Sequence, residues 1–178
     1  MTTSTMPTTP PPQEPSDKLT DTHELLAGYL DYYRATILRK LDGMSEEDLR
    51  SSRLPSGWTP LTLLKHLTFV ELRWLQWGFL AEDVDEPWGD VGPDGAWAVG
   101  PGETSEQVRA AFEEQCARSR AIVAAARLDE VARGGGRFDP PDPPPALVWI
   151  LFHLLQEYAR HAGHLDVVRE LADGTVDQ

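Results

Sequence analysis

The chain has 178 residues, which is enough for one domain with a substantial core and leaves little room for a second. Its 16 basic and 29 acidic residues give a formal net charge of −13, which would repel phosphate backbones and anionic lipid. Nucleic-acid binding is therefore disfavoured. No apolar run is long enough to cross a bilayer, so we expect no contact with a membrane.

The cysteine content and the first residues indicate the compartment and the domain boundary. The single cysteine, Cys116, cannot form an internal disulfide, and the N-terminus has neither the basic nor the apolar segment of a secretion signal. We therefore expect a cytoplasmic protein. Residues 1–18 are rich in Thr and Pro with little to bury, so we expect a disordered tail before one domain that spans 19–178.

The first half of the chain contains two segments with the apolar spacing of amphipathic helices. The first is predicted at 20–42, where Asp21 supplies a capping signal. The second follows Thr59-Pro60, which is an N-cap and a proline in the first turn, and extends to Leu80.

The second half contains two more such segments. One begins at a capping box formed by Thr104 and Gln107 and continues to Leu128. The other occupies 146–171 and can be opened by Pro145, whose missing N–H costs nothing at a first helical position. Four amphipathic helices without a strand pattern predict an all-α fold, namely a four-helix bundle.

A long connection at 82–103 separates the second and third helices and carries Trp88 and Trp97. Long loops without regular structure are uncommon in small domains and are often binding loops. The alternative is that the tryptophans only hold the loop over an edge of the core.

The helix at 146–171 contains a set of residues that suits a metal ion. Glu157 and His161 are four apart and therefore point the same way, with His153 and His164 on the same stripe. His66 lies in the other strongly apolar helix. Two neutral imidazoles and one carboxylate are the ligand set of a catalytic zinc, and they also suit non-haem iron.

Spacing alone leaves alternatives to a metal site open. Residue 66 reaches the others only if the second and fourth helices are neighbours in the bundle. The same residues could form a hydrogen-bonded polar patch, or the helix could expose this face to water. His153 and His164 also leave the choice of ligands ambiguous.

Two motifs surround these residues, namely LKHL at 64–67 and EYARHAGHLD at 157–166. They resemble the DinB-like metalloenzyme superfamily, and the similarity covers nearly all of 20–173. Within the superfamily the chain is most similar to the mycothiol-dependent branch, which includes a maleylpyruvate isomerase and free-standing S-transferases. The isomerase has an additional C-terminal domain for which this chain has no room, so the transferases are the expected relatives.

The resemblance implies a DinB-like four-helix bundle in which His66, Glu157 and His161 hold a divalent metal ion. Most of the superfamily has a histidine where this chain has Glu157. The glutamate matches the zinc-binding mycothiol branch. Zinc is therefore the expected metal, with nickel or iron as alternatives.

The resemblance also implies an activity, namely a zinc-dependent S-transferase for detoxification that uses mycothiol as cosubstrate and an electrophilic small molecule as second substrate. Open coordination at the zinc would let an incoming thiol lose its proton. We expect His164 to act as a nearby base and Asp166 to orient a histidine. Arg160 and Trp97 are expected to contact the cosubstrate.

Two other functions remain open at this point. One is a non-enzymatic bundle that keeps its metal for stability and binds a small molecule or a protein. The other is a hydrolase in which metal-activated water attacks directly and no thiol is required. Cys116 falls within the apolar face of its helix and is interpreted as a buried small hydrophobe, because no basic residue is obviously poised to lower its pKa. A monomer and a homodimer are both compatible with the sequence.

Overall fold

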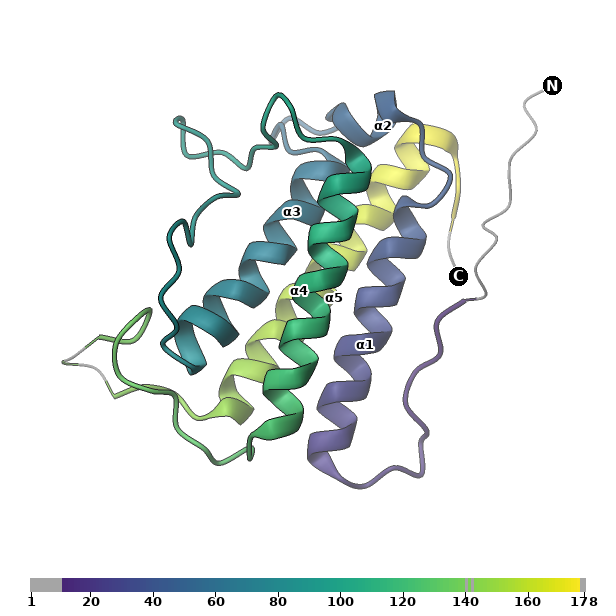
Figure 1. Cartoon of the computed structure of the whole chain (residues 1–178). Coiled ribbons are helices and arrows are strands. Elements are labelled where there is room, and N and C mark those ends of the chain that lie inside the picture. The colour runs from purple at the N-terminus through teal and green to yellow at the C-terminus, as the bar shows by residue number, and fades with distance from the viewer. Residues whose placement is uncertain (1–10, 140, 142, 177–178) are drawn as a thin grey trace.

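The protein folds as an all-α bundle (Figure 1), described by a computed structural model that covers residues 11–139, 141 and 143–176. The long helices are α1 (Thr22–Leu41), α3 (Pro60–Glu71) with its continuation η1 (Leu72–Phe79), α4 (Ser105–Ala125) and α5 (Leu147–Asp173), and α2 (Glu46–Arg50) is a short helix near one end of the bundle. The described ranges contain isolated β-bridges but no strand.

The four long helices share one apolar core. α1 packs mainly against α5 and α3 against α4, and contacts of α3 with α5 and of α1 with α4 close the bundle. Leu30, Leu63, Phe112 and Ile150 are fully buried, one from each long helix. The α3–α5 contact is the condition that a metal site between these helices requires.

The predicted helix starts are largely confirmed. The Asp21 side chain accepts a hydrogen bond from the Glu24 amide at 2.9 Å, and Thr59 and Thr104 each form a capping box. The expected start at Pro145 is wrong, because the N-cap of α5 is Ala146. Pro145 lies outside α5, and its carbonyl oxygen accepts a hydrogen bond from the Ala132 amide at 2.9 Å.

Two helix ends differ from the prediction. The helix predicted to run to Leu128 ends at Ala125, since the Leu128 carbonyl accepts a hydrogen bond from the Val148 amide and so belongs to the α4–α5 connection. The helix predicted to run regularly to Leu80 changes at Leu72 to the wider π-helix of η1. Apolar spacing does not distinguish the two helix types over so short a run, and π-helical turns occur frequently at functional sites.

A buried polar cluster joins all four long helices. Glu71 on α3 is completely buried and accepts a hydrogen bond from Arg34 Nε on α1 at 2.7 Å and another from the Tyr158 hydroxyl on α5. Cys116 Sγ on α4 lies 3.8 Å from the same carboxylate oxygen. One carboxylate is thus shared by side chains of α1, α4 and α5.

The expected disordered tail is only partly within the described residues, because 1–10 lie outside them. Residues 11–18 form no helix, but Pro15 packs against α1, where a Cβ added at Gly28 would lie 2.8 Å from the Pro15 Cγ. The boundary at residue 19 stays a prediction. Within the described part of the chain, no helix is long and apolar enough to cross a membrane.

Candidate metal centre

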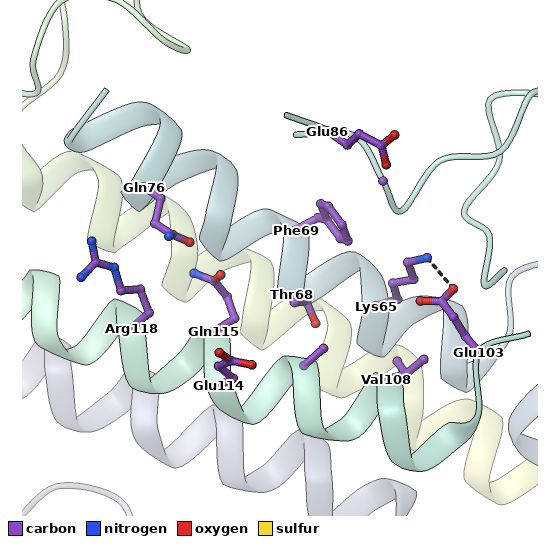
Figure 2. Close-up of a pocket in the computed structure, with 12 residues that line it drawn as sticks. Lys65, Thr68, Phe69, Gln76, Glu86, Glu103, Val108, Glu114, Gln115 and Arg118 are labelled. Carbon is purple, nitrogen blue, oxygen red and sulfur yellow. Dashed lines mark hydrogen bonds and ion pairs between the residues drawn. The ribbon is translucent and has the colours of Figure 1, made fainter. Parts of the chain in front are cut away.

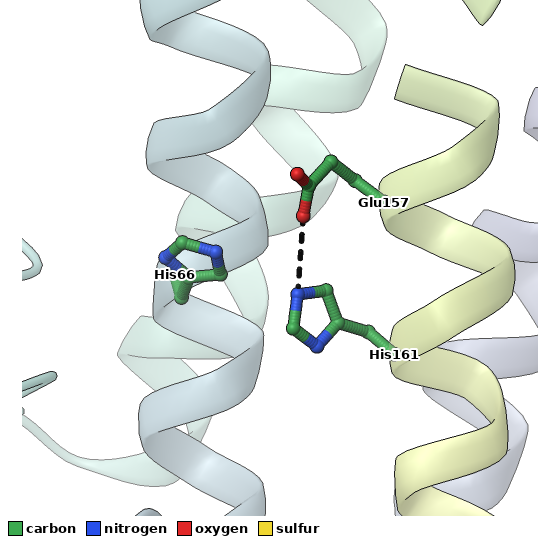
Figure 3. A group of neighbouring side chains, drawn as sticks. All are labelled: His66, Glu157 and His161. Carbon is green, nitrogen blue, oxygen red and sulfur yellow. Dashed lines mark ion pairs between the residues drawn. The ribbon is translucent and has the colours of Figure 1, made fainter. Parts of the chain in front are cut away.

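His66, Glu157 and His161 face one another across the α3–α5 contact (Figure 3). Each offers one ligand atom, and these three atoms all lie within 4.8 Å of one another. His161 Nε2 lies 3.2 Å from Glu157 Oε2, as the helical spacing of four residues requires. The structure therefore brings together the three residues that the sequence singled out, with the donor chemistry of a divalent metal site.

Asp90 fixes the orientation of the His66 ring. His66 Nδ1 lies 2.9 Å from Asp90 Oδ2, and because a carboxylate only accepts hydrogen bonds, Nδ1 donates and Nε2 is left as the nitrogen available to a metal. Asp90 is fully buried and is held in turn by Arg73, whose two guanidinium nitrogens lie 2.6 and 3.2 Å from its oxygens. The sequence analysis missed Asp90, since no local pattern connects it with His66.

The protonation states of this group suit metal binding. Burial lowers the pKa of His66, and His161 adds to this effect while Asp90 opposes it. Burial acts to raise the pKa of Asp90, but the hydrogen bonds from His66 and Arg73 outweigh it and leave that pKa below its ordinary value. The hydrogen bond with His161 lowers the pKa of Glu157. A neutral His66 and an ionised Glu157 are the forms that bind a cation.

The long loop presents a second residue to the same imidazole. The Trp97 ring stacks on His66 with the centroids 3.9 Å apart and the planes 18° apart, and it meets His161 edge-on at 5.4 Å. The Ala98 amide donates to the Asp90 carbonyl at 2.8 Å, and Val91 pairs with Trp97 in a β-bridge. This tight turn of the loop therefore carries both Asp90 and Trp97 to His66.

Two further histidines flank the group. His153 Nε2 lies 3.5 Å from Glu157 Oε1, and burial lowers the pKa of His153. His164 Nδ1 lies 3.3 Å from His161 Nδ1, and burial together with His161 lowers the pKa of His164. Both contact the candidate ligands, so neither is excluded from the site by position.

Asp166 and Arg160 are the other two residues of α5 to which the sequence analysis gave a role at the site. Asp166 forms an ion pair with Lys40 across the α1–α5 contact, so the carboxylate that holds a histidine of the group is Asp90 rather than Asp166. Arg160 is exposed on α5, close enough to His164 for its charge to lower the pKa of that histidine.

Cys116 has the environment of an unreactive thiol. It is buried, and burial together with the charge of Glu71 raises the pKa of the thiol to about 12. At neutral pH almost no thiolate forms on such a group. The interpretation of Cys116 as a buried hydrophobe is confirmed.

A separate groove of about 540 Å³ lies between α3 and α4 beside the long loop (Figure 2). Phe69 and Lys65 line it from α3, Gln115 and Arg118 line it from α4, and Lys65 Nζ pairs with Glu103 Oε2 at 2.7 Å. None of its described lining residues belongs to the candidate metal group. The groove is thus a feature distinct from that group.

Comparison with known families agrees with this geometry. The family described as Mycothiol-S-transferase matches residues 25–174, a range that contains all of α3, η1, α4 and the candidate metal group. A comparison with curated proteins finds no match. The chain therefore belongs to the mycothiol S-transferase family, which is part of the DinB-like superfamily.

Proposed function

We propose that the protein is a zinc-dependent S-transferase that joins the sulfur of mycothiol to an electrophilic carbon of a small molecule. The observation that carries this proposal is the convergence of His66, Glu157 and His161 from two helices of the bundle. Membership of the family supports mycothiol as the thiol. The unreactive Cys116 supports a mechanism in which the sulfur arrives on a cosubstrate.

The reaction forms one bond from sulfur to carbon. With an alkyl halide, the halide departs from that carbon with its bonding electron pair, and the thiol proton passes to a base. With a Michael acceptor, the π electron pair moves to the conjugated system, which takes up a proton in place of expelling a leaving group. A divalent metal held by the three residues would supply a Lewis acid that lowers the pKa of the thiol.

The surrounding residues have separate roles in this proposal. Asp90 occupies Nδ1 of His66 and would leave Nε2 as the atom that holds the metal. The face of Trp97 covers His66 and limits the approach of water on that side. His164, which is exposed beside His161, would accept the thiol proton and pass it to solvent.

The test is a transfer assay with mycothiol and a panel of alkyl halides and Michael acceptors. Zinc-loaded protein should form the thioether of each reactive electrophile, and protein stripped with a chelator should lose this activity and regain it with zinc. A reaction without thiol that yields the hydrolysed electrophile would instead indicate a hydrolase. Metal that changes only the melting temperature, with no turnover, would indicate a non-enzymatic bundle.

A further inference from the structure

The loop between α4 and α5 places Arg137 against the end of η1. The Arg137 amide donates to the Trp77 carbonyl at 3.2 Å, and the Arg133 amide donates to the Phe79 carbonyl at 3.0 Å. Gly136 has a φ of 57°, and a Cβ added there would clash with the Trp77 carbonyl oxygen. Gly136 therefore allows the loop to dock closely here, where a residue with a Cβ could not.

The Arg137 guanidinium is held by aromatic rings rather than by a carboxylate. Its Cζ lies 4.2 Å from the ring centroid of Trp74 and 5.9 Å from that of Trp88. Among the residues that the structure describes, no carboxylate forms an ion pair with it. Arg73 also contacts Trp88, with its Cζ 4.4 Å from the ring centroid. In contrast to Arg137, it donates two hydrogen bonds to the carboxylate of Asp90.

This guanidinium is half-buried in a chain with a strong excess of acidic residues. Burial and the charge of Arg73 lower the pKa of Arg137, which means that its positive charge is poorly compensated. A partly desolvated cation with free donors is stabilised by an anion that accepts those hydrogen bonds. Aromatic contacts alone satisfy the faces of the guanidinium but not its N–H groups.

Arg137 stands at one edge of the candidate metal group. Trp74 contacts Arg137 on one side and His153 on the other, where the ring centroids are 4.1 Å apart. His153 reaches Glu157 at 3.5 Å. Trp97, which is expected to contact the thiol cosubstrate, stacks on His66 at the far end of the contacts that run from Trp74 through His153, Glu157 and His161. The edge at Trp74 is therefore left for the second substrate.

We propose that Arg137 binds a carboxylate of the electrophilic substrate, so that the enzyme acts preferentially on small electrophiles that carry an anionic group. That the bound carboxylate belongs to a substrate rests on the proposed transferase function. The planar guanidinium fork of Arg137 fits a carboxylate with two parallel hydrogen bonds, which a lysine cannot reproduce.

Turnover of a matched pair of electrophiles tests the preference. Para-chloromethylbenzoate and para-chloromethylbenzamide react by the same substitution and differ in charge. Wild type should prefer the benzoate. Arg137→Gln should lower kcat/KM for the benzoate by about ten- to one-hundredfold, mainly by raising KM. It should change kcat/KM for the benzamide by less than about threefold. Arg133→Gln, four residues earlier in the same loop, should leave both unchanged.

Binding without turnover separates this proposal from the proposed function. A carboxylate can also bind a metal ion directly, so the unreactive para-methylbenzoate is titrated into chelator-treated protein, with quenching of tryptophan fluorescence as the readout. Wild type and Arg133→Gln should bind it more tightly than para-methylbenzamide, and Arg137→Gln should not. That result would stand even if no thiol transfer were found.

Two results would overturn carboxylate binding by Arg137. Equal losses for benzoate and benzamide in Arg137→Gln, or no preference for the benzoate in wild type, would mean that Arg137 only packs against Trp74. If Arg137→Gln does not fold, Arg137→Lys decides the matter. It keeps the charge but loses the fork, and it should weaken only benzoate binding, whereas an unchanged benzoate affinity would overturn carboxylate recognition by the guanidinium.

Discussion

Asp90 and His66 are 24 residues apart in the sequence, and their side chains meet with Nδ1 of the imidazole 2.9 Å from Oδ2 of the carboxylate. The contact fixes which imidazole nitrogen faces Glu157 and His161. It also ties the long loop to α3 at the candidate metal group. Metal ligands of this kind depend on such outer contacts for orientation and basicity.

Asp90→Asn should therefore weaken metal binding by about ten- to one-hundredfold without unfolding the protein. The amide keeps the size of the carboxylate and can still accept a hydrogen bond, but it does not hold the His66 N–H with a charge. Zinc affinity measured against a chelating indicator checks this expectation. Asp94→Asn, in the exposed part of the same loop, is the control and should bind zinc as wild type does. Equal affinities for all three proteins would contradict the role of Asp90.

The sequence predicts the metal group better than its surroundings, and the reason is physical. Glu157 and His161 are related by helical spacing, which the sequence displays directly. Placing His66 with them needs only that α3 and α5 be neighbours, and the contact between these helices meets that condition. Asp90 and Arg137 reach the site through irregular loops, whose paths depend on tertiary contacts that no local pattern encodes.

The change from the α-helix α3 to the π-helix η1 could not be predicted from the sequence either. Its residues have the apolar spacing of an ordinary helix, and the π-helical turns are visible only in the hydrogen-bond pattern. The consequence is local but bears on the site, because Arg73 and Trp74 lie in η1. Arg73 holds Asp90, and Trp74 contacts His153.

The neighbouring histidines of α5 should differ in their effect on metal content. His161→Ala removes a proposed ligand and should leave well under one equivalent of zinc on the purified protein. His164→Ala removes a residue that contacts His161 but lies outside the group of three, and it should keep nearly full occupancy. Elemental analysis of both variants beside wild type decides the assignment. Full zinc content in the His161→Ala protein would show that the ligands are wrongly chosen.

Cys116 should be unreactive in the folded protein. Its pKa of about 12 implies that iodoacetamide modifies the native chain very slowly at pH 8 and modifies it rapidly in urea. Cys116→Ala should retain thiol transfer, because the reacting sulfur belongs to the cosubstrate. Mass spectrometry of native and unfolded samples measures the modification, and fast native alkylation accompanied by loss of transfer would contradict a purely structural thiol.

The same thiol has a consequence for stability at high pH. The folded-state pKa lies above the ordinary value near 8.5, so the unfolded chain loses its proton first as the pH rises. The stability that depends on the neutral thiol is present in full below about pH 8 and declines above it. The melting temperature of wild type should therefore fall more steeply between about pH 8 and 10.5 than that of Cys116→Ala. Parallel curves would show that Cys116 does not contribute.

The buried pair of Arg34 and Glu71 should be sensitive to the loss of one partner. In Arg34→Met the carboxylate of Glu71 stays fully buried, and among the described residues it keeps only the Tyr158 hydroxyl as a strong donor. Asp31, the other carboxylate that Arg34 contacts, remains paired with Arg120 at 2.7 Å. An uncompensated buried charge costs about 3–5 kcal/mol, so the free energy of unfolding in urea should fall by about that amount.

Two further variants separate charge burial from lost packing in that result. Replacing both partners, in Arg34→Met with Glu71→Leu, removes the charge along with its partner and should recover a large part of the lost stability. Arg118→Met breaks a partly exposed pair with Glu82 on the surface of α4 and should change the free energy of unfolding by no more than about 1 kcal/mol. If the double variant is as unstable as Arg34→Met, the cost comes from packing of the Arg34 side chain rather than from the buried carboxylate.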